Sequence, residues 1–186
     1  MDLFKAIKQR RSIYPHQFND KIIADADIKK LLELANWAPT HRKTEPWRFK
    51  IISGDFKQKA GKFFKMVYWN NTEKPKTFKA KKILQKFEQS SHVIAVCMQR
   101  DPKESVPEWE EIAATAMAVQ NMWIASSALN IGMYWSTPSF KESLQDLIPL
   151  AEGERCLGFL YCGYFEDEVN LLERQSDIST KVIWKK

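Results

Sequence analysis

The first residues that could do chemistry are Arg10, Arg11 and Ser12, close to the amino terminus. Two guanidinium groups and a hydroxyl can hold a phosphate through charge-assisted hydrogen bonds. The same residues also fit ordinary charge at the carboxyl end of a helix, with Ser12 in a turn. The triplet therefore indicates an anion site only in combination with other features.

A second group lies in residues 38–49, where Pro39 and Pro46 restrict the backbone of a loop. His41 in this loop can donate a hydrogen bond to a carbonyl or phosphate group of a ligand, although a solvated loop histidine explains it equally well. The prolines mean that polar groups of this loop are positioned by the backbone.

A third group is the stretch Asn-Ile-Gly-Met-Tyr-Trp-Ser-Thr-Pro at residues 130–138. Hydroxyls of Ser136 and Thr137 occur beside the aromatic face of Trp135, which suits a flat polar heterocycle; the alternative is a hydrophobic strand stopped by a proline. The apolar strand at 156–164 is followed by Arg174, which by itself is unremarkable.

Familiar catalytic and nucleotide-binding motifs are absent from the sequence. There is no GxGxxG, no Walker A loop, no GxSxG and no HExxH, and the three cysteines and three histidines have no metal-ligand spacing. With only six glycines, any phosphate must be held by side chains and helix ends. We therefore expect neither a protein nucleophile nor a metal site.

The chain of 186 residues carries a net charge of +6, which favours anionic ligands. Lysine and arginine are scattered along the sequence, so nucleic acid is not an expected partner. Unpaired cysteines in strand-like runs and an amino terminus without an apolar signal segment predict a cytoplasmic protein.

The hydrophobic pattern predicts a mixture of helices and strands in one domain over residues 1–186. Because the strands do not alternate with helices in the βαβ manner, the fold class is α+β. Expected helices are 2–10, 25 or 27 to 35, 57–69, 79–89, 108 to about 129, and 140–148; expected strands are 47–53, 93–98, 133–135 and 156–164.

Local details of these elements can also be predicted. Leu3, Phe4 and Ile7 should face inward from the first helix, and Asp25 or Asp27 should cap the second. Gly132 should end the long helix, and the apolar residues 182–184 should dock somewhere.

Residues 112–140 contain no charged side chain. Polar residues within this run make it unsuitable for lipid, so we expect no membrane as partner. A helix that is apolar on nearly all sides is buried on nearly all sides. In a chain of this size, the second copy of a homodimer can supply that burial.

Together, the motifs RRS, AP-x-H-x-x-x-x-PWRF, NIGMYWSTP and GFLYCGY occur in an order that resembles the FMN-dependent nitroreductase family, in particular its short bacterial members. The resemblance covers nearly the whole chain. It implies a central, mostly antiparallel sheet flanked by helices, in an intertwined homodimer with FMN at the subunit interface.

The resemblance also implies roles for individual residues. Arg10, Arg11 and Ser12 match positions that hold the FMN phosphate, ribityl chain and pyrimidine edge, and Arg174 matches a basic phosphate ligand. His41 matches another flavin contact, and Trp37 matches a position contributed by the partner chain. Residues beside the flavin ring are matched by Trp135, Ser136 and Thr137.

The implied activity is reduction of nitroaromatics, quinones or similar acceptors, with NADH or NADPH as donor, by ping-pong hydride transfer through flavin N5. Alternatives are another flavin reaction (dehalogenation, flavin cleavage or dehydrogenation), a non-catalytic flavin carrier and, more remotely, a basic nucleic-acid-binding module. Tyr14, Lys43 and Glu45 depart from the family pattern, which has Arg, Asn and Gln at these positions.

Overall fold

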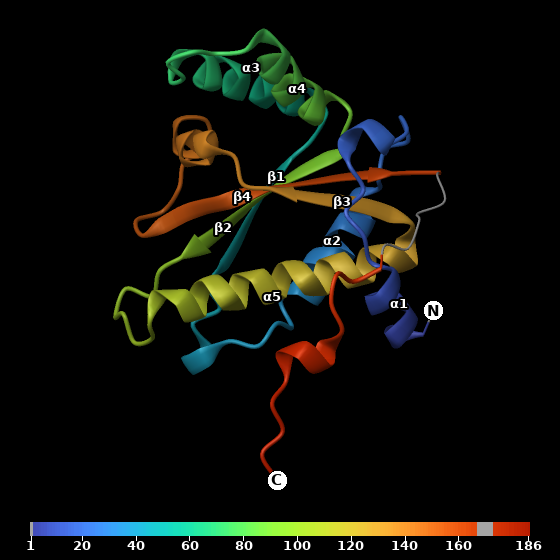
Figure 1. Ribbon diagram of the computed structural model, residues 1–186. Helices are drawn as coiled ribbons and strands as arrows, with labels where there is room; N and C mark the ends of the chain where they lie inside the picture. The colour runs from blue at the N-terminus through green and yellow to red at the C-terminus, as the bar shows by residue number, and fades with distance from the viewer. Residues whose placement is uncertain (1, 167–172) are drawn as a thin grey trace.

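The computed structural model describes residues 2–166 and 173–186. Its centre is an antiparallel sheet of four strands in the order β1-β2-β4-β3 (Figure 1). The strands are β1 (Trp47–Ile52), β2 (His92–Gln99), β3 (Ile131–Ser136) and β4 (Glu154–Tyr164). Helices cover both faces of the sheet, which confirms the predicted α+β class.

The helices are α1 (Leu3–Gln9), α2 (Asp25–Ala35), α3 (Gly54–Asn70), α4 (Thr77–Glu88) and α5 (Glu108–Ser126). Figure 1 shows α3 and α4 side by side on one face of the sheet and α2 and α5 on the other, with α1 near the carboxyl end of α5. Short 3-10 turns are Pro15–Gln17, His41–Lys43, Ser127–Leu129, Ser139–Asp146 and Ile178–Lys181.

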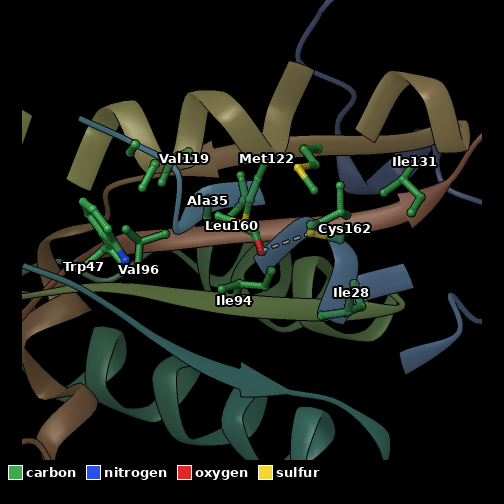
Figure 2. Close-up of a cluster of buried hydrophobic side chains, with 14 of the residues drawn as sticks. Ile28, Ala35, Trp47, Ile94, Val96, Val119, Met122, Ile131, Leu160 and Cys162 are labelled. Carbon is green, nitrogen blue, oxygen red and sulfur yellow. Dashed lines mark hydrogen bonds between the residues drawn. The ribbon is translucent and has the colours of Figure 1, made fainter. Parts of the chain in front are cut away.

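Successive side chains of β2 point to opposite faces of the sheet, so this strand contributes to a hydrophobic core on each face. Ile94 and Val96 belong to the core beneath α2 and α5, whereas Val93, Ala95 and Cys97 belong to the core beneath α3 and α4. Figure 2 shows the first of these cores, with side chains of α2, α5 and the strands packed together. Since both faces are buried, β2 is a continuous apolar run rather than an alternating one.

The long helix does not end at Gly132, as the sequence suggested. It continues as a 3-10 turn to Leu129, and Asn130 ends it in the left-handed conformation with φ 54°. Asparagine tolerates this conformation because its short polar side chain bonds locally. Gly132 lies within β3, where a Cβ would be 2.8 Å from the Cβ of Ile13.

Two other local predictions were wrong. The segment 140–148 forms the 3-10 turn Ser139–Asp146 rather than an α-helix. Ala24 is the residue before α2 and makes no side-chain capping bond. The Asp25 carboxylate instead lies 3.3 Å from the Nε2 atom of buried His92.

The first helix and the carboxyl-terminal tail differ from expectation in the same way. Leu3, Phe4 and Ile7 are exposed, although the helix pattern suggested that they face inward, and Ala6 is the buried residue of α1. Ile183 and Trp184, expected to dock, are 86% and 82% exposed. Within the single chain, nothing among the described residues covers these side chains.

Among the described residues, no helix is both long enough and apolar enough to cross a bilayer.

Candidate functional site

A cavity of about 550 Å³ lies beside the carboxyl end of α1. The sequence-predicted residues Arg10, Arg11, Ser12 and Arg174 all line it, although more than 160 residues separate the first three from the last. The remaining lining residues are Tyr14, Glu173, Gln175, Ser176 and Lys181. The fold thus gathers four cationic side chains around one hollow.

Backbone contacts fix the position of this cation cluster. Ser12 forms a parallel bridge with Met133 of β3, and the Ile13 amide donates to the Met133 carbonyl over 3.0 Å. Gly132 permits this close approach, because a larger residue would collide with Ile13. Residues Ser12 and Ile13 therefore lie alongside the edge of the sheet, next to β3.

Side-chain contacts orient the two arginines. The guanidinium of Arg10 lies 4.8 Å from the ring centre of Trp123 on α5. Trp123 donates from Nε1 to the Arg11 carbonyl over 3.1 Å, and Arg11 donates from Nη1 to the Lys8 carbonyl over 2.7 Å. The buried Nε atom of Arg11 has no hydrogen-bond partner among the described residues.

The electrostatics of the cavity favour a bound anion. Burial lowers the pKa of Arg10, and the positive charges of Arg11 and Arg174 lower it further. Like charges gathered at partial burial repel each other unless an opposite charge joins them. Glu173 is the one carboxylate among the described lining residues, so positive charge remains in excess around the cavity.

A second cavity of about 490 Å³ adjoins the first, since Tyr14 lines both. Its walls include Tyr134 and Lys86, whose ammonium group lies 5.1 Å from the ring centre of Tyr134. The rings of Tyr14 and Tyr134 are 4.6 Å apart. Burial lowers the pKa of Lys86, and the charge of Lys82 lowers it further.

The predicted residues Trp135, Ser136 and Thr137 lie at the end of β3, beyond the Ser12 bridge. Trp135 and Ser136 pair with Leu160 and Phe159 of β4, so the strand holds them in place. Neither cavity is lined by these three residues. They continue the edge of β3 away from the cation cluster.

The loop that contains His41 is held at the other end of α5. His41 Nδ1 lies 2.6 Å from a carboxylate oxygen of Glu110, in the first turn of that helix. Arg42, Lys43 and Glu45 have φ values of 50°, 56° and 41°, which are costly for residues other than glycine. The Thr40 hydroxyl hydrogen-bonds with the Thr44 hydroxyl and accepts from the Glu45 amide, and both bonds stabilise this backbone.

Within one chain, the predicted site residues fall into two separate groups. Arg10 contacts Trp123, whereas His41 contacts Glu110, and the 13 helical steps from Glu110 to Trp123 span about 20 Å. Trp37 is 80% exposed and lines neither cavity. The single chain therefore brings Arg10, Arg11, Ser12 and Arg174 together but leaves Trp37 and His41 apart from them.

The structure adds residues that the sequence did not single out. Lys181 joins the cation cluster, and Lys86 and Tyr134 line the adjoining cavity. Lys86 is one of many lysines in its region, so no local signal distinguished it. The described residues contain no group of three potential metal ligands.

Comparisons with known proteins identify the family. Residues 7–164 match the nitroreductase family model. The chain is 28% identical over 174 residues to YfhC of Bacillus subtilis (strain 168), a protein named as a candidate NAD(P)H nitroreductase, covering 90% of this chain and 87% of that one.

Solved structures show the same fold. A nitroreductase-like family protein from Bacillus cereus has a TM-score of 0.84 and 26% identity, covering 100% of this chain and 96% of the other. A candidate nitroreductase from Desulfovibrio desulfuricans, solved in complex with FMN, has a TM-score of 0.72 and 22% identity, covering 100% and 98%. The family match spans most of the sequence and the folds agree, so the chain belongs to the nitroreductase family.

Proposed function

We propose that this protein is an FMN-dependent oxidoreductase that takes electrons from NADH or NADPH and reduces electron-poor acceptors such as nitroaromatics or quinones. The observation that carries the proposal is the cation cluster of Arg10, Arg11, Arg174 and Lys181 around one cavity. The FMN complex of a fold relative and the NAD(P)H assignment of a sequence relative support it.

The cation cluster fits the phosphate of FMN. Guanidinium groups recognise phosphate through paired N–H donors, and the unpaired Arg11 Nε offers a further donor. A phosphate dianion would also relieve the repulsion that lowers the pKa of Arg10. The cavity of about 550 Å³ lies within the size range of small-molecule sites.

The adjoining cavity suits the polar edge of a flat ring. Tyr14 and Tyr134 offer aromatic faces, and Lys86 offers a half-buried cation. When bound, FMN supplies a ring that accepts and releases hydride at N5. Lys86 would stabilise negative charge at the ring edge, and Ser12 would donate or accept a hydrogen bond there.

Ser136, Thr137 and Trp135 extend along the same edge of β3, and we assign them to the rest of the ring. The pairing of Trp135 and Ser136 with β4 holds this stretch in place, which would keep the ring position fixed. Tyr14 replaces the arginine of the family pattern, and its ring packs at a tilt against Tyr134 instead of adding another charge.

The site is complete only if two chains combine. Exposed apolar side chains gather on the α5 face of the sheet and on the segments beside it: Leu3, Phe4, Leu34, Trp37, Trp109, Ile112, Met117, Ile183 and Trp184. Large exposed apolar patches mark interfaces. We propose that a second copy covers this face and brings its Trp37 and His41 to the cation cluster of the first.

Absorption spectroscopy tests the function. Purified protein reconstituted with FMN should be yellow, bleach with NADH or NADPH under argon, and regain colour with a nitroaromatic or quinone. A yellow protein that does not bleach would instead support the flavin-carrier alternative. A protein without affinity for FMN would contradict the whole proposal.

A further inference from the structure

The positive charge of this protein is concentrated in one helical hairpin. Residues 54–89, which form α3, α4 and their connection, contain ten lysines against three acidic residues. The rest of the chain contains 19 basic and 20 acidic residues. The hairpin alone therefore accounts for the net charge of +6, although the lysines seemed scattered along the sequence.

Most of these lysines are directed to solvent. Lys57 donates to the Ser90 carbonyl, and Lys86 is half-buried beside Tyr134. The other eight are exposed, and none of them belongs to an ion pair formed among the described residues. Their charge is therefore available to a partner.

Large apolar side chains are exposed among the lysines. Met66 and Phe78 are each 54% exposed, and Trp69 is 45% exposed. Met66 and Trp69 lie with Lys62 and Lys65 around a shallow hollow of about 310 Å³ on α3. On α4, the ammonium of Lys82 lies 5.2 Å from the Phe78 ring centre.

Helical spacing places these residues on one surface. Lys59, Lys62, Met66 and Trp69 follow an i, i+3, i+7, i+10 pattern, which is one side of a helix. Ala60, Phe64 and Val67 form the opposite, buried side. Figure 1 shows α3 and α4 as the outermost layer on their side of the sheet, away from α5.

We propose that this outer face of α3 and α4 binds the surface of membranes rich in anionic lipid. Lysines attract anionic headgroups, while Trp, Phe and Met side chains insert at the boundary of the acyl chains. Long lysine stems lie along apolar surface and keep their charges at the headgroups. Binding at the surface requires no membrane-spanning helix.

Two features favour lipid over other anionic partners. The hairpin contains no arginine, whereas base readout in nucleic acids and protein interfaces both favour arginine. Single-stranded nucleic acid also binds in grooves that follow its backbone, whereas this face is an outer helical layer (Figure 1). The proposal replaces the expectation, made from the sequence, that a membrane is not a partner.

Vesicle sedimentation tests the proposal with the flavin-loaded or flavin-free full chain. The protein should sediment with vesicles of equal parts phosphatidylcholine and phosphatidylglycerol, and remain in the supernatant with phosphatidylcholine alone. The double variant Lys62→Glu, Lys65→Glu should lower the partition coefficient about 25-fold or more, because each lost lysine costs about fivefold at an anionic surface. The added carboxylates are repelled by the same surface.

The matched control is Lys103→Glu, Lys185→Glu, which makes the same change of net charge at exposed positions outside the hairpin. Its partition coefficient should remain within about twofold of the unmodified protein. An equal loss in both double variants would overturn the proposal, because it would show that overall charge rather than this face matters.

Insertion of the apolar side chains has its own readout. Brominated acyl chains should quench part of the tryptophan fluorescence, and Trp69→Phe should remove most of that quenching while circular dichroism stays unchanged. Absence of vesicle binding, or binding of single-stranded DNA in its place, would overturn the proposal. These readouts do not depend on enzymatic turnover, so they are independent of the proposed function.

Discussion

The two helical layers of this protein both expose large apolar side chains, but they do so in different electrostatic surroundings. On the α5 side, Trp109 and Met117 lie on a helix whose residues from 112 onward carry no charge. On the α3–α4 side, Met66 and Trp69 lie with the exposed lysines Lys62 and Lys65. The exposed fractions of these apolar side chains do not distinguish the two surfaces.

The difference indicates what each surface can be buried against. An uncharged apolar helix can pack against its own copy without leaving a charge desolvated. Lysines among apolar side chains would repel a second copy, but they would attract an anionic surface. The local density of charge therefore separates a proposed dimer face from a proposed lipid-binding face.

The largest expected effect is on dimer stability, when a carboxylate is placed on the α5 face rather than on the α3–α4 face. Met117→Asp should raise the dimer dissociation constant about 100-fold or more, because each copy would bury an uncompensated charge. Size-exclusion chromatography with light scattering measures this change. Met66→Asp, the matched variant on α3, should remain dimeric; dissociation of both variants, or of neither, would break the distinction between the faces.

Removing a cation from the cavity should have the next largest effect. Arg10→Ala should weaken FMN binding about 10- to 100-fold, the usual cost of losing a hydrogen bond between charged groups. Fluorescence titration of flavin-free protein measures the affinity. Arg155→Ala removes an exposed arginine that pairs with Glu108, and it should leave the affinity unchanged. Equal affinities of Arg10→Ala and unmodified protein would contradict the assigned role.

Gly132 in β3 and Gly61 in α3 provide matched tests of packing near the cation cluster and in the α3–α4 layer. A Cβ at Gly132 would be 2.8 Å from Ile13, and one at Gly61 would be 2.9 Å from Phe87. Each Gly→Ala change should cost about 1–3 kcal/mol of stability, the usual cost of overpacking. Urea unfolding measures the cost. Only Gly132→Ala should also weaken FMN binding, since it displaces the segment that carries Ser12.

The smallest effect concerns Lys86. Burial lowers the pKa of Lys86 below its ordinary value of 10.5, so the unfolded chain binds more protons between the lowered pKa and 10.5. Stability should therefore rise with pH through that window. Lys86→Met should abolish this dependence and raise stability at neutral pH by up to about 0.5 kcal/mol. The exposed control Lys81→Met should keep the pH dependence, as followed by urea unfolding at neutral and alkaline pH.

Sequence reasoning predicted the elements that have strong periodicity. The strand at 93–98 and the long helix from Glu108 were found because their apolar patterns are long and continuous. The prediction of the end of the long helix was wrong, because two residues near that end are both typical of helix termini. Asn130 rather than Gly132 ends the helix, since Gly132 is required for the contact with Ile13 in β3.

The candidate site was only partly predictable for a similar reason. Arg10, Arg11 and Ser12 form a recognisable triplet, whereas only the fold shows that Arg174 lines the same cavity. Lys86 and Lys181 carry no distinguishing local pattern. Their significance comes from side chains that are distant in sequence and adjacent in space, such as Tyr14 beside Tyr134.

The sequence by itself determined the α+β class, the main helices and strands, and the family to which the chain belongs, because these depend on local periodicity and on short motifs in order. Tertiary structure alone decided which cations share a cavity and which apolar side chains remain uncovered in one chain. Leu3 and Phe4 illustrate the reason: periodicity shows that a helix has an apolar side, but only packing shows whether the same chain covers it.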